Sequence, residues 1–208
     1  MGQPTGTLRM TAPAGFSRHA LPQLVAAYRD AFPSVKVEVT FTNREIDLVA
    51  EGIDLALRVG PLKDSSMIAR KLADGFGGLF ASRAYLDRQG VPKTIEDLTG
   101  HRLIGFGRAT SAKMRRGGKL VDVPFDAPIM SNDFHMTRAM IDLDLGIGYL
   151  PALMAEAGSY DPPLIRVLPE YSSVKTALYF AYPRQKFVPA RVKSFVAFAT
   201  ARAADFKS

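Results

Sequence analysis

The sequence predicts an α/β protein built as two lobes, each with strands covered by helices. Segments with the two-residue alternation of strands and segments with helical spacing follow one another through the first third of the chain. This order gives a parallel sheet with helices packed on it. The 208 residues are too many for one minimal domain and about right for one large domain or two small lobes. No Gly/Ser-rich linker is present, so we expect the chain to cross between lobes more than once, near residues 72–75 and 168–174.

The first lobe opens with a strand over residues 7–12, where Leu8 and Met10 alternate with Arg9 and Thr11. Pro13 interrupts this strand. The expected elements that follow are a helix with Leu21, Leu24, Val25, Tyr28 and Phe32 on one face, a strand over residues 35–41, a short helix over residues 45–51 that stops at Gly52, and strands over residues 55–59 and 68–72.

The pattern changes after residue 75, and the elements become shorter and more varied. Thr94 and Asp97 have the spacing of a capping box, and Gly117-Gly118 is typical of a hairpin tip. The expected elements are helices over residues 83–89 and 133–143, a hairpin over residues 111–124, strands over residues 103–106, 147–150, 164–168 and 174–182, and a last helix over residues 189–204 with Val192, Phe195, Val196 and Ala199 inward.

Composition excludes several classes of function. The chain has 27 basic and 20 acidic residues, a net charge of +7, but the charges are scattered. The densest basic cluster, residues 113–119, is expected to be a solvated turn, because its four positive charges are too few to drive DNA binding. The absence of cysteine excludes disulfides, thiolate metal sites and cysteine nucleophiles, and it suits the cytoplasm. No apolar run of ~18 residues exists, and residues 1–6 do not resemble a secretory signal.

No catalytic, metal or cofactor motif is complete. The segment 15–19 lacks the closing glycine of a nucleophile elbow, and the Gly-x-Gly pairs at 105–107 and 146–148 lack the third glycine of a dinucleotide site. Gly118-Lys119 is followed by leucine, which rules out a phosphate-binding P-loop. We therefore expect no enzyme, no cofactor and no metal, with surface or capping roles for His19, His101 and His135, and solvation for Asp142 and Asp144.

A binding site is the remaining expectation. Ligands of open α/β sheets lie outside the carboxyl ends of the strands, here at residues 11–16, 42–43 and 59–61. Taken singly, these segments could be a turn, a helix cap and a strand stop. The helix after Gly15 would offer free backbone N–H groups to a carboxylate or phosphate. Arg58 lies in an apolar strand, so it needs a partner: Asp47 or Asp54, or alternatively an anionic ligand.

The order of several segments resembles the effector-binding domain of LysR-type transcription regulators. The segment from Asp47 to Gly60, with its sequel from Asp64 to Leu72, is the most recognisable. The match extends over nearly the whole chain through residues 6–13, 21–22, 28–33, 81–86, 98–101, 131–133, 146–151 and 191–198.

The resemblance implies a fold like type 2 periplasmic binding proteins: two Rossmann-like lobes, formed by residues 1–73 with 169–208 and by residues 74–168, with a ligand cleft between them. A small effector, expected to be anionic, would bind there and shift the population of lobe arrangements. Ala12 and Ala14 stand where many members carry a hydroxyl residue, which weakens the case for a bound carboxylate. The effector-binding positions implied are Ala12, Pro13, Phe16, Thr42, Asn43, Val59, Phe106, Ser131, Asn132 and Ile147.

The resemblance also implies partners. Members act in the cytoplasm and bind DNA through an N-terminal helix-turn-helix domain, which this sequence does not contain; the chain is therefore expected to be a fragment. They dimerise through the effector-binding domain, here through the helices over residues 21–32 and 133–143, and the full-length protein could be a tetramer. Alternatives are a transporter's solute-binding protein, which needs an export signal, and an enzyme on the same fold, which needs a catalytic pair.

Overall fold

The computed structural model describes residues 3–18, 20–60, 65–155 and 163–203. Contacts divide the chain into two units, Met1–Asp74 with Thr176–Lys207, and Gly75–Lys175. The elements combine helices with mixed sheets, so the protein belongs to the α/β class that the sequence predicts.

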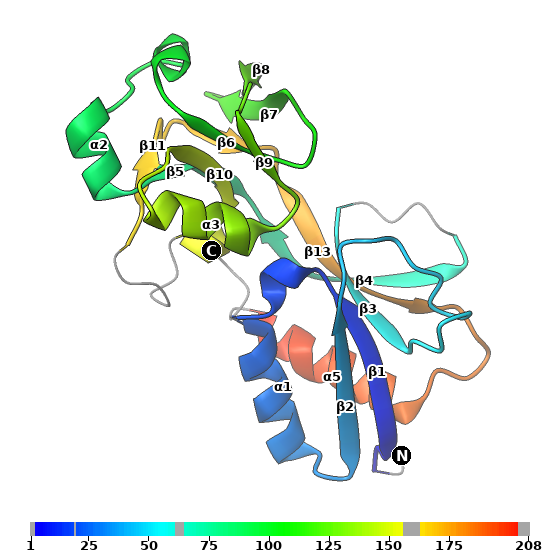
Figure 1. Ribbon diagram of the computed structural model, residues 1–208. Coiled ribbons are helices and arrows are strands. Elements are labelled where there is room, and N and C mark those ends of the chain that lie inside the picture. The colour runs from blue at the N-terminus through cyan, green and yellow to red at the C-terminus, as the bar shows by residue number, and fades with distance from the viewer. Residues whose placement is uncertain (1–2, 19, 61–64, 156–162, 204–208) are drawn as a thin grey trace. The chain divides into compact units, whose positions relative to one another are not determined.

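Unit 1 is a five-stranded sheet with two long helices on one face (Figure 1). The strand order is β2-β1-β3-β13-β4; β1 runs parallel to β2 and β3, and β13 runs antiparallel to β3. The elements are β1 (Gly6–Ala12), a 3-10 turn (Ala14–Phe16), α1 (Ala20–Ala31), β2 (Val35–Phe41), β3 (Leu55–Val59), β4 (Met67–Gly75), β13 (Thr176–Pro183) and α5 (Ala190–Ala201).

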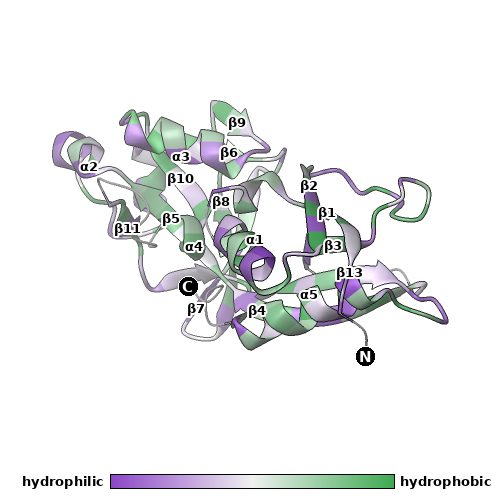
Figure 2. Ribbon diagram, turned by 90° about the horizontal axis from the view of Figure 1, so that it is seen from below, coloured by the Kyte–Doolittle hydropathy of each residue, from purple (hydrophilic) through white to green (hydrophobic). Residues whose placement is uncertain are grey.

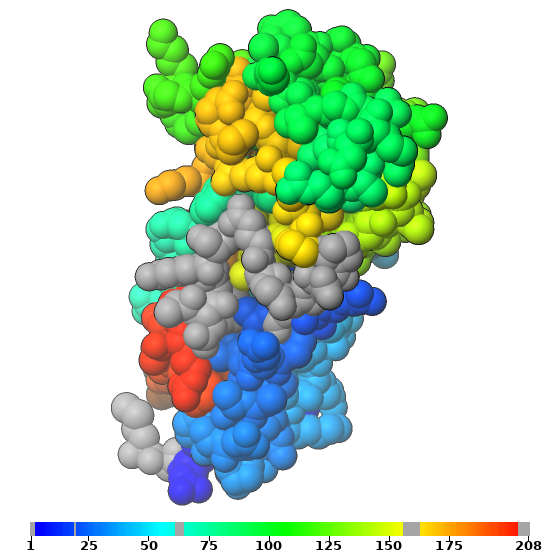
Figure 3. Space-filling view, turned by 90° about the vertical axis from the view of Figure 1, so that its left-hand side faces the viewer, coloured from blue at the N-terminus to red at the C-terminus, as the bar shows by residue number. Residues whose placement is uncertain are grey.

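The main core of unit 1 lies between the sheet and the helices α1 and α5. Leu8, Leu57 and Phe180 on the strands pack with Tyr28 of α1 and Phe195 of α5, all with 0% exposure. Figure 2 shows hydrophilic and hydrophobic residues together on α1, as expected for a helix with one buried face. The two helices lie side by side (Figure 3), and the Tyr28 hydroxyl bonds the Ser194 hydroxyl at 2.7 Å.

The other face of this sheet is covered by the segment 42–54, where the predicted helix over residues 45–51 is wrong. The segment forms turns instead. The Asp47 carboxylate accepts hydrogen bonds from the N–H groups of Val49 and Ala50, at 2.9 and 3.1 Å, a local pattern that competes with helix formation. The segment is held by a small cluster against the sheet, formed by Leu48, Ala56, Ala181, Ile46, Ile53 and Met67.

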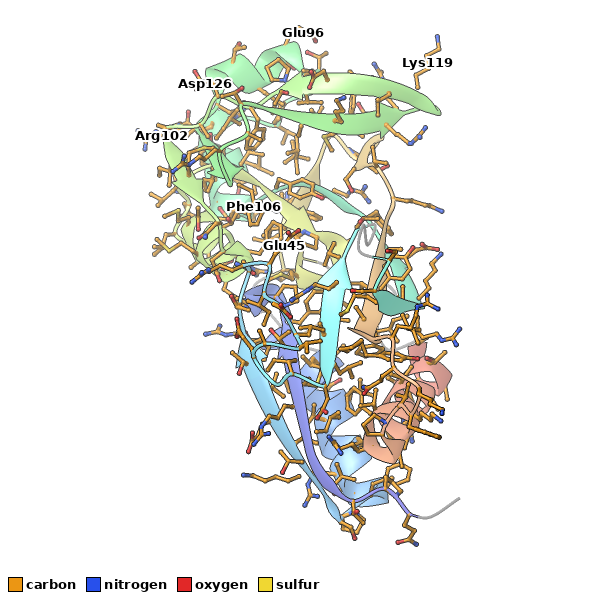
Figure 4. All side chains as sticks on the ribbon, turned by 90° about the vertical axis from the view of Figure 1, so that its right-hand side faces the viewer. Glu45, Glu96, Arg102, Phe106, Lys119 and Asp126 are labelled. Atoms are coloured by element: carbon orange, nitrogen blue, oxygen red, sulfur yellow. The ribbon has the colours of Figure 1, made fainter. Side chains whose placement is uncertain are left out.

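Unit 2 contains a five-stranded sheet and a three-stranded sheet, with orders β11-β5-β10-β6-β9 and β12-β7-β8. The elements are β5 (Gly77–Ala81), α2 (Arg83–Gln89), a 3-10 turn (Glu96–Gly100), β6 (Leu103–Phe106), β7 (Ser111–Arg116), β8 (Lys119–Pro124), β9 (Ile129–Ser131), α3 (Phe134–Asp142), β10 (Ile147–Pro151), α4 (Ala152–Ala155), β11 (Ile165–Val167) and β12 (Tyr171–Ser173). The hairpin of β7 and β8 was predicted, and Lys119 lies at its tip (Figure 4).

Candidate functional site

The loops at the carboxyl edge of the unit 1 sheet are joined by two hydrogen bonds. Thr42 N–H donates to the Ala12 carbonyl at 2.9 Å, and Ala14 N–H donates to the Asn43 amide oxygen at 3.2 Å. Val59 ends β3 beside these loops, because β1 and β3 run parallel, and its side chain is 50% exposed. The predicted positions in this unit therefore gather at one edge of the sheet.

The 3-10 turn after β1 differs from the expected helix start. Phe16 N–H donates to the Pro13 carbonyl and Ser17 N–H to the Ala14 carbonyl, both at 3.0 Å. The Ala14 N–H is bonded to Asn43, so the backbone N–H groups of Ala14, Phe16 and Ser17 all have acceptors, and the described part of α1 is Ala20–Ala31. Phe16 is half-buried against the core, so its ring fixes the turn. Fewer free backbone N–H groups are therefore available here to bind an anion than the sequence predicted.

Arg58 does not have the partners predicted for it. The Asp54 carboxylate bonds the Arg191 guanidinium at 2.7 Å and the backbone N–H of Arg9 at 3.0 Å. The Asp47 carboxylate is occupied by two backbone N–H groups of its own turn. Burial lowers the pKa of the half-buried Arg58 guanidinium, and the negative charge of Glu45 opposes that shift.

Unit 2 brings together three of its four predicted positions. Phe106 and Ser131 end the neighbouring parallel strands β6 and β9, and Asn132 follows with an exposed side chain. The Ser131 hydroxyl accepts the Asp133 N–H at 3.1 Å. Phe106 stacks on Phe134, which was not predicted as a site residue, with ring centroids 3.8 Å apart and planes 9° apart. The sheet edge therefore carries an aromatic pair beside small polar groups.

Ile147 lies apart from the other positions in unit 2. It pairs with Leu103, at the amino end of β6, whereas Phe106 ends that strand. Its side chain has 0% exposure and belongs to a hydrophobic core. Ile147 therefore packs the interior, and we do not include it in the candidate site.

The glycines next to Ile147 have packing roles. A Cβ on Gly146 would lie 2.3 Å from the Arg102 carbonyl oxygen, and one on Gly148 would lie 2.8 Å from the Ile141 side chain. The contact with the Arg102 backbone requires glycine at position 146, whereas a Cβ at position 148 would require the Ile141 side chain to move. The Gly-x-Gly pattern of residues 146–148 thus reflects the packing of β10.

The polar residues considered for catalysis or metal binding have structural contacts. Within the described residues, no group of three or more His, Asp or Glu could hold a metal ion. The prediction that Asp142 and Asp144 are only solvated is wrong: Asp142 holds the buried Arg138, and Asp144 bonds Ser82 and Arg88. Those hydrogen bonds from Ser82 and Arg88 lower the pKa of Asp144. His19 lies outside the described residues.

The described helices include none long and apolar enough to cross a lipid bilayer.

Comparison with known proteins gives consistent matches along nearly the whole chain. A family model described as the LysR substrate binding domain matches residues 1–204. The HTH-type transcriptional regulator PtxR of Pseudomonas aeruginosa is 29% identical over 200 residues, which are 94% of this chain and 64% of that protein. The regulator CrgA of Neisseria meningitidis serogroup C is 28% identical over 201 residues, covering 94% of this chain and 66% of CrgA. The chain thus spans about two-thirds of the length of these relatives.

Solved structures give matches of the same kind. The CrgA regulatory domain from Neisseria meningitidis, described as a LysR-type transcriptional regulator, has a TM-score of 0.86 and 25% identity, covering 96% of this chain and 100% of that one. The full-length virulence activator AphB of Vibrio cholerae has a TM-score of 0.83 and 26% identity, covering 95% of this chain and 69% of that one.

Proposed function

The chain belongs to the LysR substrate binding domain family, and on this premise we propose that it senses a small effector for a LysR-type transcription regulator. The fold is the type 2 periplasmic-binding-protein-like fold of LysR regulatory domains, as predicted. The similar proteins are named as transcriptional regulators, and this supports a regulatory role in place of an enzymatic one. A role as a transporter's solute-binding protein is not favoured by these matches.

The observation that carries effector binding is the meeting of the loops after β1 and β2 with the end of β3 at the carboxyl edge of the unit 1 sheet. Parallel strands place such loops together, and this edge is where ligands of α/β sheets bind. We propose that the effector is a small anionic metabolite. The residues proposed to contact it are Ala12, Pro13, Phe16, Thr42, Asn43 and Val59 of unit 1, and Phe106, Ser131 and Asn132 of unit 2.

We propose that the effector acts by shifting the population of two arrangements of the domain. A ligand that binds one arrangement more tightly favours that arrangement. In the whole regulator this would change the spacing of paired DNA-binding helices on their half-sites. We propose that DNA binds only to the helix-turn-helix domain of the whole regulator, and that the protein acts in the cytoplasm.

The partner of this domain is proposed to be a second copy of the chain. The exposed residues Met136, Ala139 and Leu143 follow one another at helical spacing on and just after α3. An apolar face of this kind is typical of an association surface. We propose that α3 and α1 form the homodimer contacts.

Thermal unfolding of the chain with a panel of organic acids, amino acids, aromatic carboxylates and their neutral amides tests the function. A ligand at about 100 times its Kd adds roughly 2.7 kcal/mol, or about 5–10 °C for a domain of this size. We expect a saturable shift that Asn43→Ala weakens and that the exposed control Lys71→Ala leaves unchanged. A shift that persists unchanged in Asn43→Ala and Phe16→Ala would contradict binding at this edge.

A further inference from the structure

Arg58 lies on the face of the unit 1 sheet that is turned away from the main core. Leu55 and Leu57 of β3 belong to that core, so the alternation of the strand puts Arg58 on the opposite face. Tyr179 of the neighbouring strand β13 is directly opposite Arg58 in the register. Thr11 of β1 shares this face, and its hydroxyl is buried with no hydrogen-bond partner among the described residues. The Thr11 hydroxyl is therefore available for a further hydrogen bond on the face of the sheet that carries Arg58.

The charge on Arg58 is balanced differently from that on two other sheltered arginines, Arg138 and Arg191. Arg138, which is 2% exposed, forms an ion pair with Asp142, and Arg191 forms one with Asp54. Among the residues that the structure describes, no carboxylate lies within 4.0 Å of the Arg58 guanidinium. The charge acting on it is that of Glu45, which lies in the exposed loop after β2 (Figure 4).

A half-buried guanidinium without a close counter-ion loses hydration free energy on folding. An anion that reaches it therefore binds more favourably than it would to a fully hydrated guanidinium. The planar guanidinium presents parallel N–H groups that match the two oxygens of a carboxylate or phosphate. Arg58 directly precedes Val59, which is 50% exposed at the edge where we propose effector binding. The backbone of Arg58 thus lies one residue from the carboxyl end of β3, at the proposed site and within the same unit.

We propose that Arg58 binds the anionic group of the effector, and that Glu45 competes for the same guanidinium when the effector is absent. This inference rests on the proposed function and gives it a chemical class, a carboxylate or a phosphate. It makes Arg58 the residue that distinguishes anionic from neutral compounds.

Titration of the chain with inorganic phosphate and with benzoate, followed by NMR of the arginine Nε–H groups, tests the proposal. Sodium chloride at matched ionic strength is the reference, because screening moves all exposed charges alike. We expect a saturable shift of the Arg58 resonance with at least one of the two anions. A change that chloride reproduces, or one no larger at Arg58 than at the exposed Arg70, would overturn the proposal.

Variants separate the roles of the two side chains. With affinity read from the Val59 amide resonance, Arg58→Met should weaken anion binding by about tenfold or more, and Arg58→Lys should weaken it less, because the charge stays but the paired N–H geometry is lost. Glu45→Gln should tighten binding by several-fold, and Arg70→Met should leave it unchanged. Unaltered affinity in Glu45→Gln would overturn the competition, and unaltered affinity in folded Arg58→Lys and Arg58→Met would overturn the site.

The panel of acids and amides distinguishes failure of this inference from failure of the proposed function. A neutral amide that stabilises the chain as well as its acid, with the effect weakened by Asn43→Ala, would leave effector sensing in place and remove the role of Arg58. If anions bind at Arg58 but the panel stabilises wild type and Asn43→Ala equally, the anion site at Arg58 would remain and effector binding at the proposed edge would be contradicted.

Discussion

The amide oxygen of Asn43 accepts a hydrogen bond from the backbone N–H of Ala14 at 3.2 Å and so links the loop after β2 to the turn after β1. The bond is solvent-exposed, and it spans 29 positions in the sequence. Since the two loops belong to neighbouring parallel strands, this contact fixes the edge at which we propose ligand binding.

Replacement of Asn43 by alanine is expected to destabilise the chain by about 0.5–1 kcal/mol, the low end for a hydrogen bond, because water can reach the freed Ala14 N–H. Asn43→Asp keeps an acceptor oxygen and should lose less. Urea denaturation of both variants checks this. Equal losses in the two variants would mean that the hydrogen bond is not the cause.

The buried ion pair of α3 should matter far more than a surface pair. Both oxygens of Asp142 accept from Arg138 Nε, at 2.9 and 3.0 Å, and Arg138 is 2% exposed. Asp142→Asn removes the negative charge from the carboxylate beside that buried cation, and we expect a loss of about 2–3 kcal/mol. Lys71 and Asp74 form a surface ion pair, and their side chains are 51% and 54% exposed. Asp74→Asn breaks this pair and should lower the free energy of unfolding by less than about 0.5 kcal/mol. Similar losses in the two variants, measured by urea denaturation, would contradict this account.

A methyl group at Gly146 should be tolerated poorly. The added Cβ would lie 2.3 Å from the Arg102 carbonyl oxygen, a backbone atom that cannot rotate away. We expect Gly146→Ala to cost about 1–3 kcal/mol, whereas Gly100→Ala, which meets nothing within 4 Å, should change stability by about 0.5 kcal/mol at most. Thermal unfolding of the two variants decides the matter. A Gly146→Ala variant as stable as Gly100→Ala would show that the strand shifts freely.

Local patterns predicted much of the fold because they act over a few residues. The capping box was predicted correctly: Thr94 N–H donates to the Asp97 carboxylate at 2.9 Å, and Asp97 N–H donates to the Thr94 hydroxyl at 3.3 Å. The last helix buries the predicted inward residues, Val192, Phe195, Val196 and Ala199. The segment 45–51 has helical spacing too, but there the Asp47 side chain binds backbone N–H groups and the apolar residues pack flat on a sheet.

The site was less predictable because its contacts join distant segments. Phe134 follows the predicted Ser131-Asn132 pair closely, yet its stacking on Phe106 depends on the pairing of β6 with β9. Arg58 was recognised as a charge in need of a partner. One of the two carboxylates expected for it, Asp54, binds Arg191, which lies 137 positions away in the sequence, and the spacing of residues could not foresee this.

Charge on the outer face of α3 should prevent self-association if that face forms the proposed dimer. Met136 is 49% exposed and Leu143, which follows the helix, is 71% exposed. Met136→Glu together with Leu143→Glu places two like charges where two copies would meet, and we expect a dimer-to-monomer change in light scattering after size exclusion. The control is Val91→Glu, because Val91 lies on the same unit and is 57% exposed. A dimer that survives the α3 changes would move the interface elsewhere.

The stability of unit 2 should depend on pH through His101. Tyr85 accepts the Arg102 N–H at 2.9 Å, and its hydroxyl lies 3.3 Å from Nδ1 of His101, to which it can donate when the imidazole is neutral. Burial lowers the pKa of His101 below its ordinary value of 6.5, and the charge of Asp97 opposes this shift. The folded state therefore favours the neutral ring.

The sign of the effect follows from proton uptake. As the pH falls below about 6.5, the unfolded chain binds a proton at this position before the folded chain does, so stability decreases until the lower pKa of the folded state is passed. We expect His101→Gln to flatten the fall of the unfolding free energy between about pH 7 and pH 5. Tyr85→Phe should move the His101 titration, followed by NMR of the ring protons, upward towards the ordinary range. A wild-type titration midpoint at or above 6.5 would contradict the neutral ring, since it would mean that the charge of Asp97 outweighs the effect of burial.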